Sequence, residues 1–236
     1  MPPLESPGQV TTTIRTTVPV LPPSSSRPHV TTPRLLLRAV APSDLEAAHA
    51  LRRQPEVMRW TSTGRVDEDT AQTAARLALY LPPNDTSNFN CAICLRETGE
   101  LVGMGGVHQF EPAAGDTSSP GWPEVGYMLR RETWGGGIAT EFLRAFLEMW
   151  EGLPREVVER TVDVRSLSPA GRAEGAGLVA EQLVAVIDGK NSGSQRVLEK
   201  CGFQKFLVYE DVDNHDAERM MELVAYRHFP QKKTVG

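Results

Sequence analysis

Three consecutive glycines join a predicted strand to a predicted helix near the middle of the chain. Residues 124–129 read as a strand, and the glycines follow at 135–137. Beyond them, Ile138, Phe142 and Phe146 recur at every fourth position, which is the spacing of one face of an amphipathic helix. Glycines let the backbone approach a ligand closely, and a helix N-terminus presents unpaired N–H groups with partial positive charge. The pattern therefore predicts an anion-binding site at this junction.

The glycine run departs from the two phosphate-binding motifs that share its composition. It has no Lys-Ser/Thr pair, as a P-loop requires, and it lacks the full spacing of a dinucleotide fingerprint. Kinase and hydride-transfer activities therefore lose support. A turn with only a structural role remains the alternative for residues 135–137.

Hydrophobic patterns elsewhere predict further strands and helices. The expected strands lie at 34–38, 89–96, 101–109, 183–187, about 204–210 and about 219–227. We expect helices to begin near Ser43, where a capping box is possible, at Asp67 as an N-cap, and at Ser192. The fold class that follows is α/β (α+β).

Composition divides the chain into one folded region and two tails. Residues 1–29 are rich in proline and serine, which predicts a disordered N-terminal tail. A transit peptide is a minor alternative, because prolines would break the amphipathic helix that it needs. The folded domain is expected over 30–230 and a C-terminal tail over 231–236. Residues 153–180 combine glycines with mixed charge and are predicted to be an insertion without a compact element.

Charge and cysteine content restrict the partners and the compartment. A formal net charge of -5 argues against a nucleic-acid binder. No apolar run approaches the roughly 20 residues that span a bilayer, so we expect a soluble, cytoplasmic protein without a membrane partner. Cys91 and Cys94 have the spacing of a zinc or redox motif, but in a strand they point to opposite faces. Core packing is favoured for them, and no metal is expected.

A second strand-helix segment carries a more specific pattern. Residues 188–203 read Asp-Gly-Lys-Asn-Ser-Gly-Ser-Gln-Arg-Val-Leu-Glu-Lys-Cys-Gly-Phe. They resemble the Asn-x-x-Ser-x-Arg-Val-Leu-Glu-Lys-x-Gly-Phe signature of the GNAT acetyltransferases, most closely its RimJ/RimL-like branch. Residues 134–141, and residues 32–38 with Ser43-Asp44 and Pro55–Met58, are similar to two further motifs of that branch. The resemblance covers about 31–228.

The resemblance implies an acetyl-CoA-dependent N-acetyltransferase. Its fold has a mostly antiparallel twisted sheet, flanked by helices and splayed between strands 4 and 5, where the pantetheine arm lies. The glycine loop would hold the pyrophosphate through backbone N–H groups, and Asn191 would contact the pantetheine. The implied cofactor-binding residues are Met128, Leu129, Arg130, Trp134, Gly135, Gly136, Gly137, Ile138, Ala139, Thr140, Asn191 and Ser194.

The resemblance also implies a role for Ser194 and shows one departure. Ser194 would protonate the departing CoA thiolate; its alternative is a first-turn hydroxyl that bonds the helix backbone. At the position where the superfamily has Arg or Gln, this chain has Glu132. The nearby Arg130 or Arg131 is expected to compensate.

The reaction requires a neutral amine, so a proton must be accepted near neutral pH, directly or through water. Glu124 is the candidate base, because Glu124, Gly126 and Met128 share one face of their strand. A solvated strand-edge carboxylate is the alternative. His108 is the reserve candidate, although a lone histidine is more often structural.

The acceptor is the least defined part. By resemblance, Met58 and Trp60 border the acceptor pocket, and the acceptor would be a protein N-terminus, a polyamine or a small amine. An acidic cluster could attract a cationic amine or form a solvated loop; it comprises Glu210, Asp211, Asp213, Asp216 and Glu218. Monomer and homodimer both remain open.

Two other functions fit part of the pattern. A non-catalytic acyl-CoA-binding sensor on the same fold would bind the cofactor without turnover. An unrelated nucleotide-binding module would explain the glycine loop but not the residues 191–203.

Overall fold

The computed structural model describes residues 11–111, 119–168, 177–213 and 216–230. The chain forms two compact units. Unit 1 comprises Met1–Val20, Gln109–Glu124 and Met149–Gly236, and unit 2 comprises Leu21–His108 and Val125–Glu148. In the described ranges, no helix is both long and apolar enough to cross a membrane.

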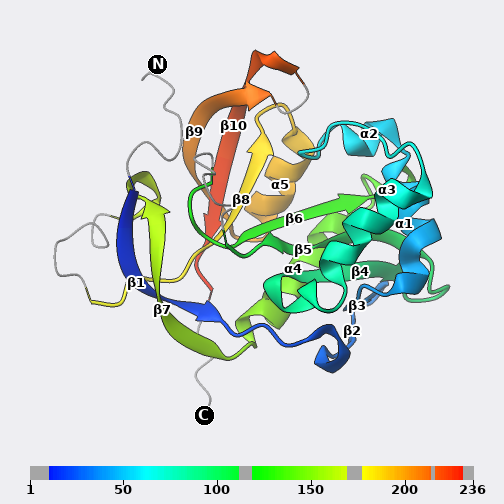
Figure 1. The fold of residues 1–236 in the computed structure, drawn as a ribbon, viewed down its shortest axis with the longest axis horizontal. Coiled ribbons are helices and arrows are strands. Elements are labelled where there is room, and N and C mark those ends of the chain that lie inside the picture. The colour runs from blue at the N-terminus through cyan, green and yellow to red at the C-terminus, as the bar shows by residue number, and fades with distance from the viewer. Residues whose placement is uncertain (1–10, 112–118, 169–176, 214–215, 231–236) are drawn as a thin grey trace. The chain divides into compact units, whose positions relative to one another are not determined.

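Unit 2 contains a run of neighbouring strands in the order β2-β3-β4-β5-β6 (Figure 1). Their bounds are β2 Val30–Thr31, β3 Leu35–Ala39, β4 Phe89–Leu95, β5 Leu101–Gln109 and β6 Glu124–Leu129, the last two ending or beginning one residue inside unit 1. β2, β3, β4 and β5 pair antiparallel in sequence. The predicted strands at 89–96, 101–109 and 124–129 are confirmed.

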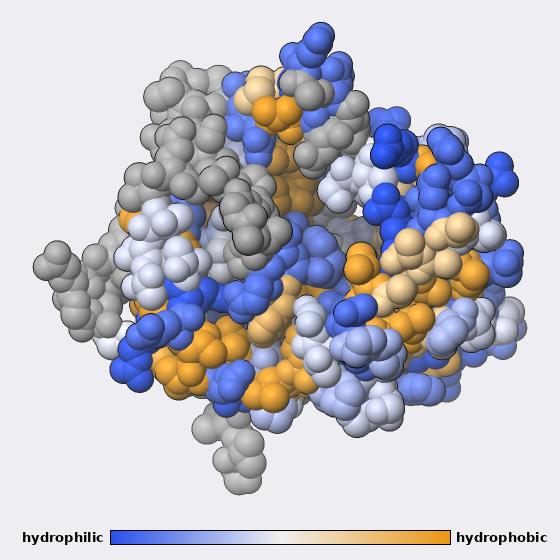
Figure 2. All heavy atoms as spheres, in the orientation of Figure 1, coloured by the Kyte–Doolittle hydropathy of each residue, from blue (hydrophilic) through white to orange (hydrophobic). Residues whose placement is uncertain are grey.

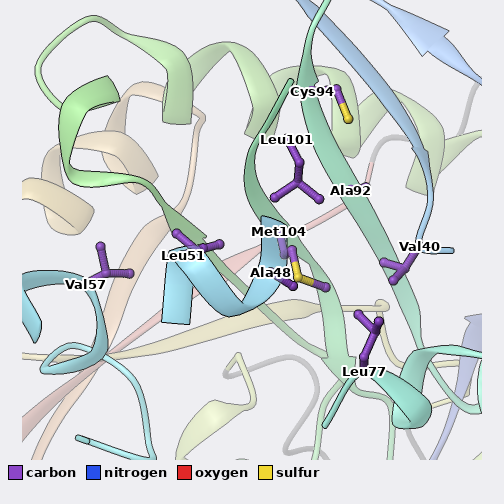
Figure 3. Packing of buried hydrophobic residues seen from close by; sticks show 9 residues of the cluster. All are labelled: Val40, Ala48, Leu51, Val57, Leu77, Ala92, Cys94, Leu101 and Met104. Atoms are coloured by element: carbon purple, nitrogen blue, oxygen red, sulfur yellow. The ribbon is translucent and has the colours of Figure 1, made fainter. Parts of the chain in front are cut away.

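Helices and 3-10 turns connect or follow the strands of this unit, and some of them share one apolar cluster with β4 and β5. They are η2 (Pro42–Asp44), α1 (Leu45–Arg52), α2 (Pro55–Met58), α3 (Thr70–Leu77), η3 (Ala78–Tyr80), η4 (Asn84–Ser87), η5 (Arg131–Thr133) and α4 (Ile138–Glu151). Figure 3 shows the cluster of Val40, Ala48, Leu51, Val57, Leu77, Ala92, Cys94, Leu101 and Met104. Leu51 of α1 has no exposed surface, so Leu51→Ala is expected to cost about 2–5 kcal/mol of stability.

Cys91 and Cys94 lie in β4, where both are buried, free thiols. Burial raises the pKa of Cys91 to about 12, which keeps it protonated. Cys201 is also free and buried. In the described part of the chain, no group of three or more His, Cys, Asp or Glu side chains is placed to hold a metal ion.

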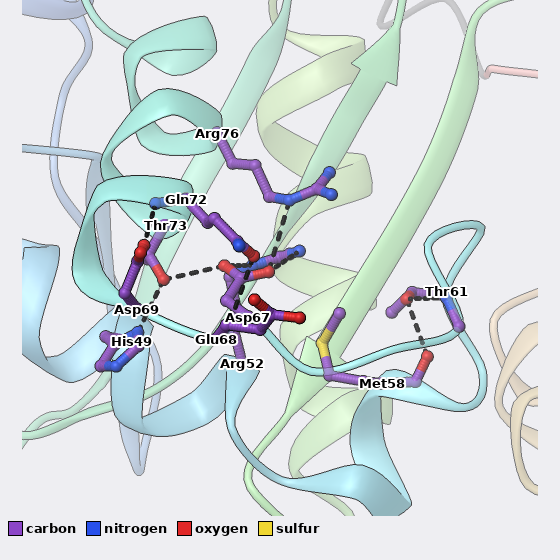
Figure 4. A network of polar contacts seen from close by, with 11 residues as sticks. His49, Arg52, Met58, Thr61, Asp67, Glu68, Asp69, Gln72, Thr73 and Arg76 are labelled. Atoms are coloured by element: carbon purple, nitrogen blue, oxygen red, sulfur yellow. Dashed lines mark hydrogen bonds and ion pairs between the residues drawn. The ribbon is translucent and has the colours of Figure 1, made fainter.

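Two predicted helix caps are wrong in detail. Asp69 caps α3, because its carboxylate accepts a hydrogen bond from the Gln72 backbone N–H at 2.8 Å. Asp67 is instead 1% exposed and ion-paired with Arg52 at 2.6 Å (Figure 4). A buried carboxylate requires a charged partner, which outweighs the gain from a cap. Ser43 lies within the 3-10 turn η2 that precedes α1, so the predicted capping box does not form there.

Several apolar residues are exposed along α3 and the 3-10 turn η3 that follows it. Ala71, Ala75, Ala78 and Leu79 are exposed, whereas Thr73 and Leu77 are buried. Figure 2 shows the corresponding pale-orange surface along α3, in the same orientation as Figure 1. Isolated alanines on a surface are ordinary and need no partner.

Unit 1 contains β7 (Arg155–Asp163), η6 (Val164–Ser166), β8 (Leu183–Asp188), α5 (Ser192–Lys200), β9 (Gln204–Asp213) and β10 (Asp216–His228). β10 pairs antiparallel with both β8 and β9. Trp122, Val162, Leu167 and Val184 form its core cluster. Gly121, at φ +84°, fits where a side chain would collide with the backbone of Thr161. The predicted strands and the helix from Ser192 are confirmed.

The N-terminal segment differs from its prediction. Residues 11–19 form β1 (Thr11–Pro19), which pairs antiparallel with β7 from Thr11↔Asp163 to Pro19↔Arg155 (Figure 1). Val18 is 3% exposed. The prediction of a disordered tail is therefore wrong for residues 11–19, and the predicted insertion at 153–180 contains their partner strand. Composition missed both because each strand satisfies its backbone hydrogen bonds on the other.

Residues 24–27 of the predicted tail are also anchored, in unit 2. The Ser24 backbone N–H donates to Asp85 Oδ2 at 2.6 Å. Arg27 is 7% exposed and donates to the carbonyl oxygens of Asp85 and Asn88. Residues 1–10 and the predicted C-terminal tail 231–236 lie outside the described residues.

Candidate functional site

The glycine loop joins η5 to α4 in unit 2. Gly135 and Gly137 have φ values of +76° and +79°, which only glycine adopts without strain. A Cβ on Gly135 would meet no atom within 4 Å, and one on Gly136 would meet only the Thr133 carbonyl oxygen, at 3.7 Å. Packing therefore does not account for these glycines; backbone conformation and open access to the loop do.

The loop presents unpaired backbone donors. Among the described residues, no acceptor is found for the N–H groups of residues 135–138. The first bond into the helix runs from Glu141 N to Gly137 O, at 3.1 Å. Four N–H groups at the N-terminus of a 14-residue helix form a positive end that suits a phosphate.

A network from β3 holds one side of the loop. Arg34 donates from Nη1 to the Gly136 carbonyl oxygen at 2.7 Å and from Nε to Glu141 Oε2 at 2.6 Å. Thr32 Oγ1 and the Arg34 backbone N–H both donate to Glu141 Oε1. Burial raises the pKa of Glu141, but the hydrogen bonds from Thr32 and Arg34 and the charge of Arg34 outweigh it, so the pKa is lowered.

A second contact holds the turn before the loop. Gln54 donates from Nε2 to both carboxylate oxygens of Glu132 at 3.0 Å, and its Oε1 accepts from the Arg131 backbone N–H at 2.8 Å. Hydrogen bonds from its own backbone and from Gln54 lower the pKa of Glu132. The carboxylate at the position of the family's Arg or Gln thus fixes the turn η5.

The expected compensating arginines are partly engaged elsewhere. Arg130 is ion-paired with Glu100. Arg131 lies over the Trp134 ring, 5.0 Å from its centroid. The sequence analysis did not identify Arg34 as a site residue, although Arg34 lies in the motif at residues 32–38 and its partner Glu141 in the motif at residues 134–141.

The other predicted cofactor residues of unit 2 lie just before and just after the glycines. Trp134 Nε1 donates to the Leu129 carbonyl oxygen at 2.8 Å. Leu129 and Ile138 are buried, Met128 packs against the apolar cluster of unit 2, and Ala139 and Thr140 are half-buried.

Asn191 and Ser194 lie in unit 1, at the start of α5. Asn191 is the N-cap, and its Oδ1 accepts from the Ser194 backbone N–H at 3.0 Å. In the described part of the chain, neither the Asn191 amide nitrogen nor Ser194 Oγ makes a hydrogen bond. Both polar groups therefore remain available to a ligand.

The two candidate bases differ in their surroundings. Glu124 is half-buried in β6, and its backbone pairs with Val184 of β8. His108 in β5 lies against Gly126, where a Cβ would be 3.1 Å from the imidazole Cε1. Although part of His108 is exposed to solvent, neighbouring atoms desolvate the ring and lower its pKa, which favours the neutral imidazole.

A buried ion pair joins the two ends of the segment that contains the predicted acceptor contacts Met58 and Trp60. Arg52 and Asp67 stand at its two ends, and Thr73 Oγ1 also donates to Asp67 (Figure 4). Met58 has no exposed surface, which assigns it to packing. Trp60 is half-buried, with the Arg59 guanidinium 4.4 Å from its ring centroid.

Comparison with known proteins agrees with this arrangement. Residues 34–204 match the family model described as the Acetyltransferase (GNAT) domain. The chain is 26% identical over 181 residues to "Uncharacterized N-acetyltransferase YoaA" of Bacillus subtilis, covering 75% of this chain and 84% of that protein.

Solved structures share the fold. A GNAT-family acetyltransferase from Bacillus anthracis superposes with a TM-score of 0.59 at 18% identity, over 86% of this chain and 99% of its own. RimL, a ribosomal L7/L12 alpha-N-protein acetyltransferase solved with coenzyme A, superposes with a TM-score of 0.61 at 15% identity, over 87% and 100%. The fold is mixed α/β with an open, antiparallel-dominated sheet flanked by helices, and the chain belongs to the GNAT acetyltransferase family.

Proposed function

We propose that this acetyltransferase moves the acetyl group of acetyl-CoA to a primary amine. The observation that carries the proposal is the set of four unpaired N–H groups at residues 135–138, which comprise three exposed glycines and the first residue of α4. Their number and their position at a helix N-terminus suit the pyrophosphate of the cofactor. The residues present therefore fit acetyl-CoA.

The proposed cofactor contacts follow the placement of each residue. The N–H groups of residues 135–140 bind the pyrophosphate, with Met128, Leu129, Arg130 and Trp134 shaping the loop. The free amide nitrogen of Asn191 donates to the pantetheine. Ser194 Oγ, which makes no hydrogen bond with the described residues, donates its proton to the departing sulfur. The splayed strands of the family remain a prediction for this chain.

The chemistry needs two proton movements. The amine nitrogen attacks the thioester carbon, a C–N bond forms and the C–S bond breaks, with the electron pair leaving on sulfur. The amine loses one proton to a base, and the sulfur gains one. Glu124 is the proposed base and His108 the second candidate; the lowered pKa of His108 favours the proton-accepting form.

A pH profile separates the two bases. A base works only when deprotonated, so kcat at saturating acceptor falls as the pH drops through its pKa. Because the pKa of His108 is lowered, a limb due to this residue lies below the ordinary value of about 6.5. Glu124→Gln and His108→Gln are compared on one acceptor. The variant that loses the acid limb, with cofactor affinity retained, identifies the base.

The acceptor is proposed as a protein N-terminus, a polyamine or a small amine. Trp60, which is half-buried, is the proposed contact with the acceptor, since Met58 is fully buried. The acidic hairpin of unit 1, in which Glu210 of β9 stands opposite Glu222 of β10, would attract a cationic acceptor through its local negative potential.

A mass-spectrometric screen of these amine classes with acetyl-CoA tests the function. We expect one class to gain an acetyl group while free thiol is released in equal amount. Tight binding of acetyl-CoA without thiol release across the panel would contradict transfer and identify a sensor.

A further inference from the structure

We propose that Arg34 completes the pyrophosphate site, as the positioning residue of the glycine loop and as the cation that the loop lacks at position 132. The inference deepens the proposed function and rests on it. Arg34 stands just before β3, far along the chain from the loop, and its contacts with the loop and α4 all lie within unit 2.

Three donors of Arg34 fix its place. The backbone N–H and Nε bind the Glu141 carboxylate, and Nη1 binds the Gly136 carbonyl oxygen. Thr32 Oγ1 adds a bond of 2.6 Å to the same carboxylate. A guanidinium held by a fork of this kind loses little further freedom when it binds an anion.

The remaining donor is available beside the loop. Among the described residues, Arg34 Nη2 makes no hydrogen bond, and a Cβ on Gly137 would lie 3.5 Å from it. The Arg34 side chain is 50% exposed. A positively charged donor is therefore exposed next to the unpaired N–H groups of residues 135–138.

Charge balance supports the same role. Glu141 stands in the first turn of α4, and its lowered pKa keeps it ionised. An unpaired carboxylate there would bind the N–H groups of the loop itself or repel an approaching phosphate. Arg34 neutralises Glu141 and still offers Nη2.

Other nearby side chains do not supply this charge in the same way. Arg130 is paired with Glu100, Arg131 lies over Trp134, and Glu132 is bound by Gln54. Arg34 is thus the arginine in contact with the glycines themselves.

The test compares two ligands that differ in phosphate. Wild type and Arg34→Ala are titrated with coenzyme A and with pantetheine, which carries no phosphate. We expect Arg34→Ala to raise the Kd for coenzyme A by roughly 10- to 100-fold, the range for a charge-assisted hydrogen bond. The Kd for pantetheine should stay unchanged. Arg53→Ala, which removes an exposed positive charge from the same unit, is the matched control and should change neither.

Arg34→Lys provides a second variant, which keeps the charge without the fork. We expect a loss smaller than that of Arg34→Ala but measurable. Unchanged coenzyme A affinity in both variants, or an equal loss for both ligands, overturns the inference. Absence of coenzyme A binding by the wild type overturns the proposed function, and the inference with it.

Discussion

Two strand-helix connections, one in each unit, carry the predicted cofactor residues, and they are stabilised in opposite ways. The β8–α5 connection is closed by its own residues: Asn191 caps Ser194 N, Asp188 Oδ1 accepts from Lys190 N, and Gln195 binds the Gly189 carbonyl oxygen. The β6–α4 connection is held by side chains from elsewhere in unit 2, Arg34 before β3 and Gln54 before α2.

The two connections differ because only one of them has side chains that can fix its own backbone. A glycine run frees its backbone N–H groups for a ligand but has no side chains with which to fix itself. Its conformation must therefore be set from outside. A capped connection is stabilised by hydrogen bonds from its own side chains, and some polar groups of these side chains remain available to a ligand. Changes at the glycine loop should consequently affect binding more than stability, whereas changes at the cap should affect both.

The largest effect is expected from Gly137→Val. A β-branched residue is strained at φ +79° and covers the backbone donors. We expect the rise in melting temperature that acetyl-CoA causes in the wild type to disappear. Gly99→Val is the matched control, since Gly99 has φ +74° and open space around its Cβ position, in the β4–β5 turn. It should lose stability but keep the shift; an undiminished shift in Gly137→Val would remove the loop from the site.

Ser194→Ala tests the capped connection at its proposed catalytic residue. The hydroxyl makes no hydrogen bond with the described residues, so its removal should not destabilise α5. We expect turnover to fall by up to roughly 100-fold with little change in acetyl-CoA affinity, because a thiolate-protonating group acts mainly in the transition state. Ser192→Ala, an exposed position two residues earlier, is the control. Equal turnover in both variants would leave the hydroxyl without a catalytic role.

Asn191 allows the two functions of the cap to be separated. Asn191→Ala should lower stability by about 1 kcal/mol through loss of the cap, and should also weaken acetyl-CoA binding. Asn191→Asp keeps the capping oxygen and removes the amide donor, so stability should remain while affinity falls. Thermal unfolding with and without acetyl-CoA measures both quantities. If Asn191→Asp binds as the wild type does, Asn191 is a cap and not a pantetheine contact.

Local patterns predicted both connections, since their periodicity and glycines lie within a short stretch of sequence. The contacts that hold the β6–α4 loop could not be predicted in this way, because Arg34 and Glu141 are 107 positions apart. β1 and β7 were missed because composition was judged over the long segments 1–29 and 153–180, although Thr and Val, which favour strands, recur within both strands. Each strand also pairs with a segment far away in the sequence, so the pairing could not be predicted locally.

The two predicted acceptor contacts also show that burial could not be predicted from the local sequence. Resemblance assigned Met58 and Trp60 together, but Met58 at the end of α2 is fully buried whereas Trp60 is half-buried. Asp67 was predicted to cap α3, but its buried carboxylate pairs with Arg52, and the exposed Asp69 caps the helix instead. Burial is a tertiary property, and neither choice is encoded in the local spacing.

The smallest effect is expected from Gln54→Ala, and it tests whether the β6–α4 loop is set from outside on its second side as well. The variant removes the bonds to Glu132 and to Arg131 N, which fix η5 ahead of the glycines. Because these contacts are exposed, stability should change by less than about 0.5 kcal/mol. The KM for acetyl-CoA should rise several-fold at unchanged kcat, since a less ordered loop weakens binding rather than the chemical step.

Gln54→Glu provides a second variant, because its carboxylate repels Glu132. The pKa of Glu132 is lowered, so Glu132 is charged over the whole working range. Gln54→Glu should thus have a higher KM than Gln54→Ala, and the difference should shrink at high salt. Identical KM values in the wild type and both variants would show that Arg34 alone is enough to hold the loop.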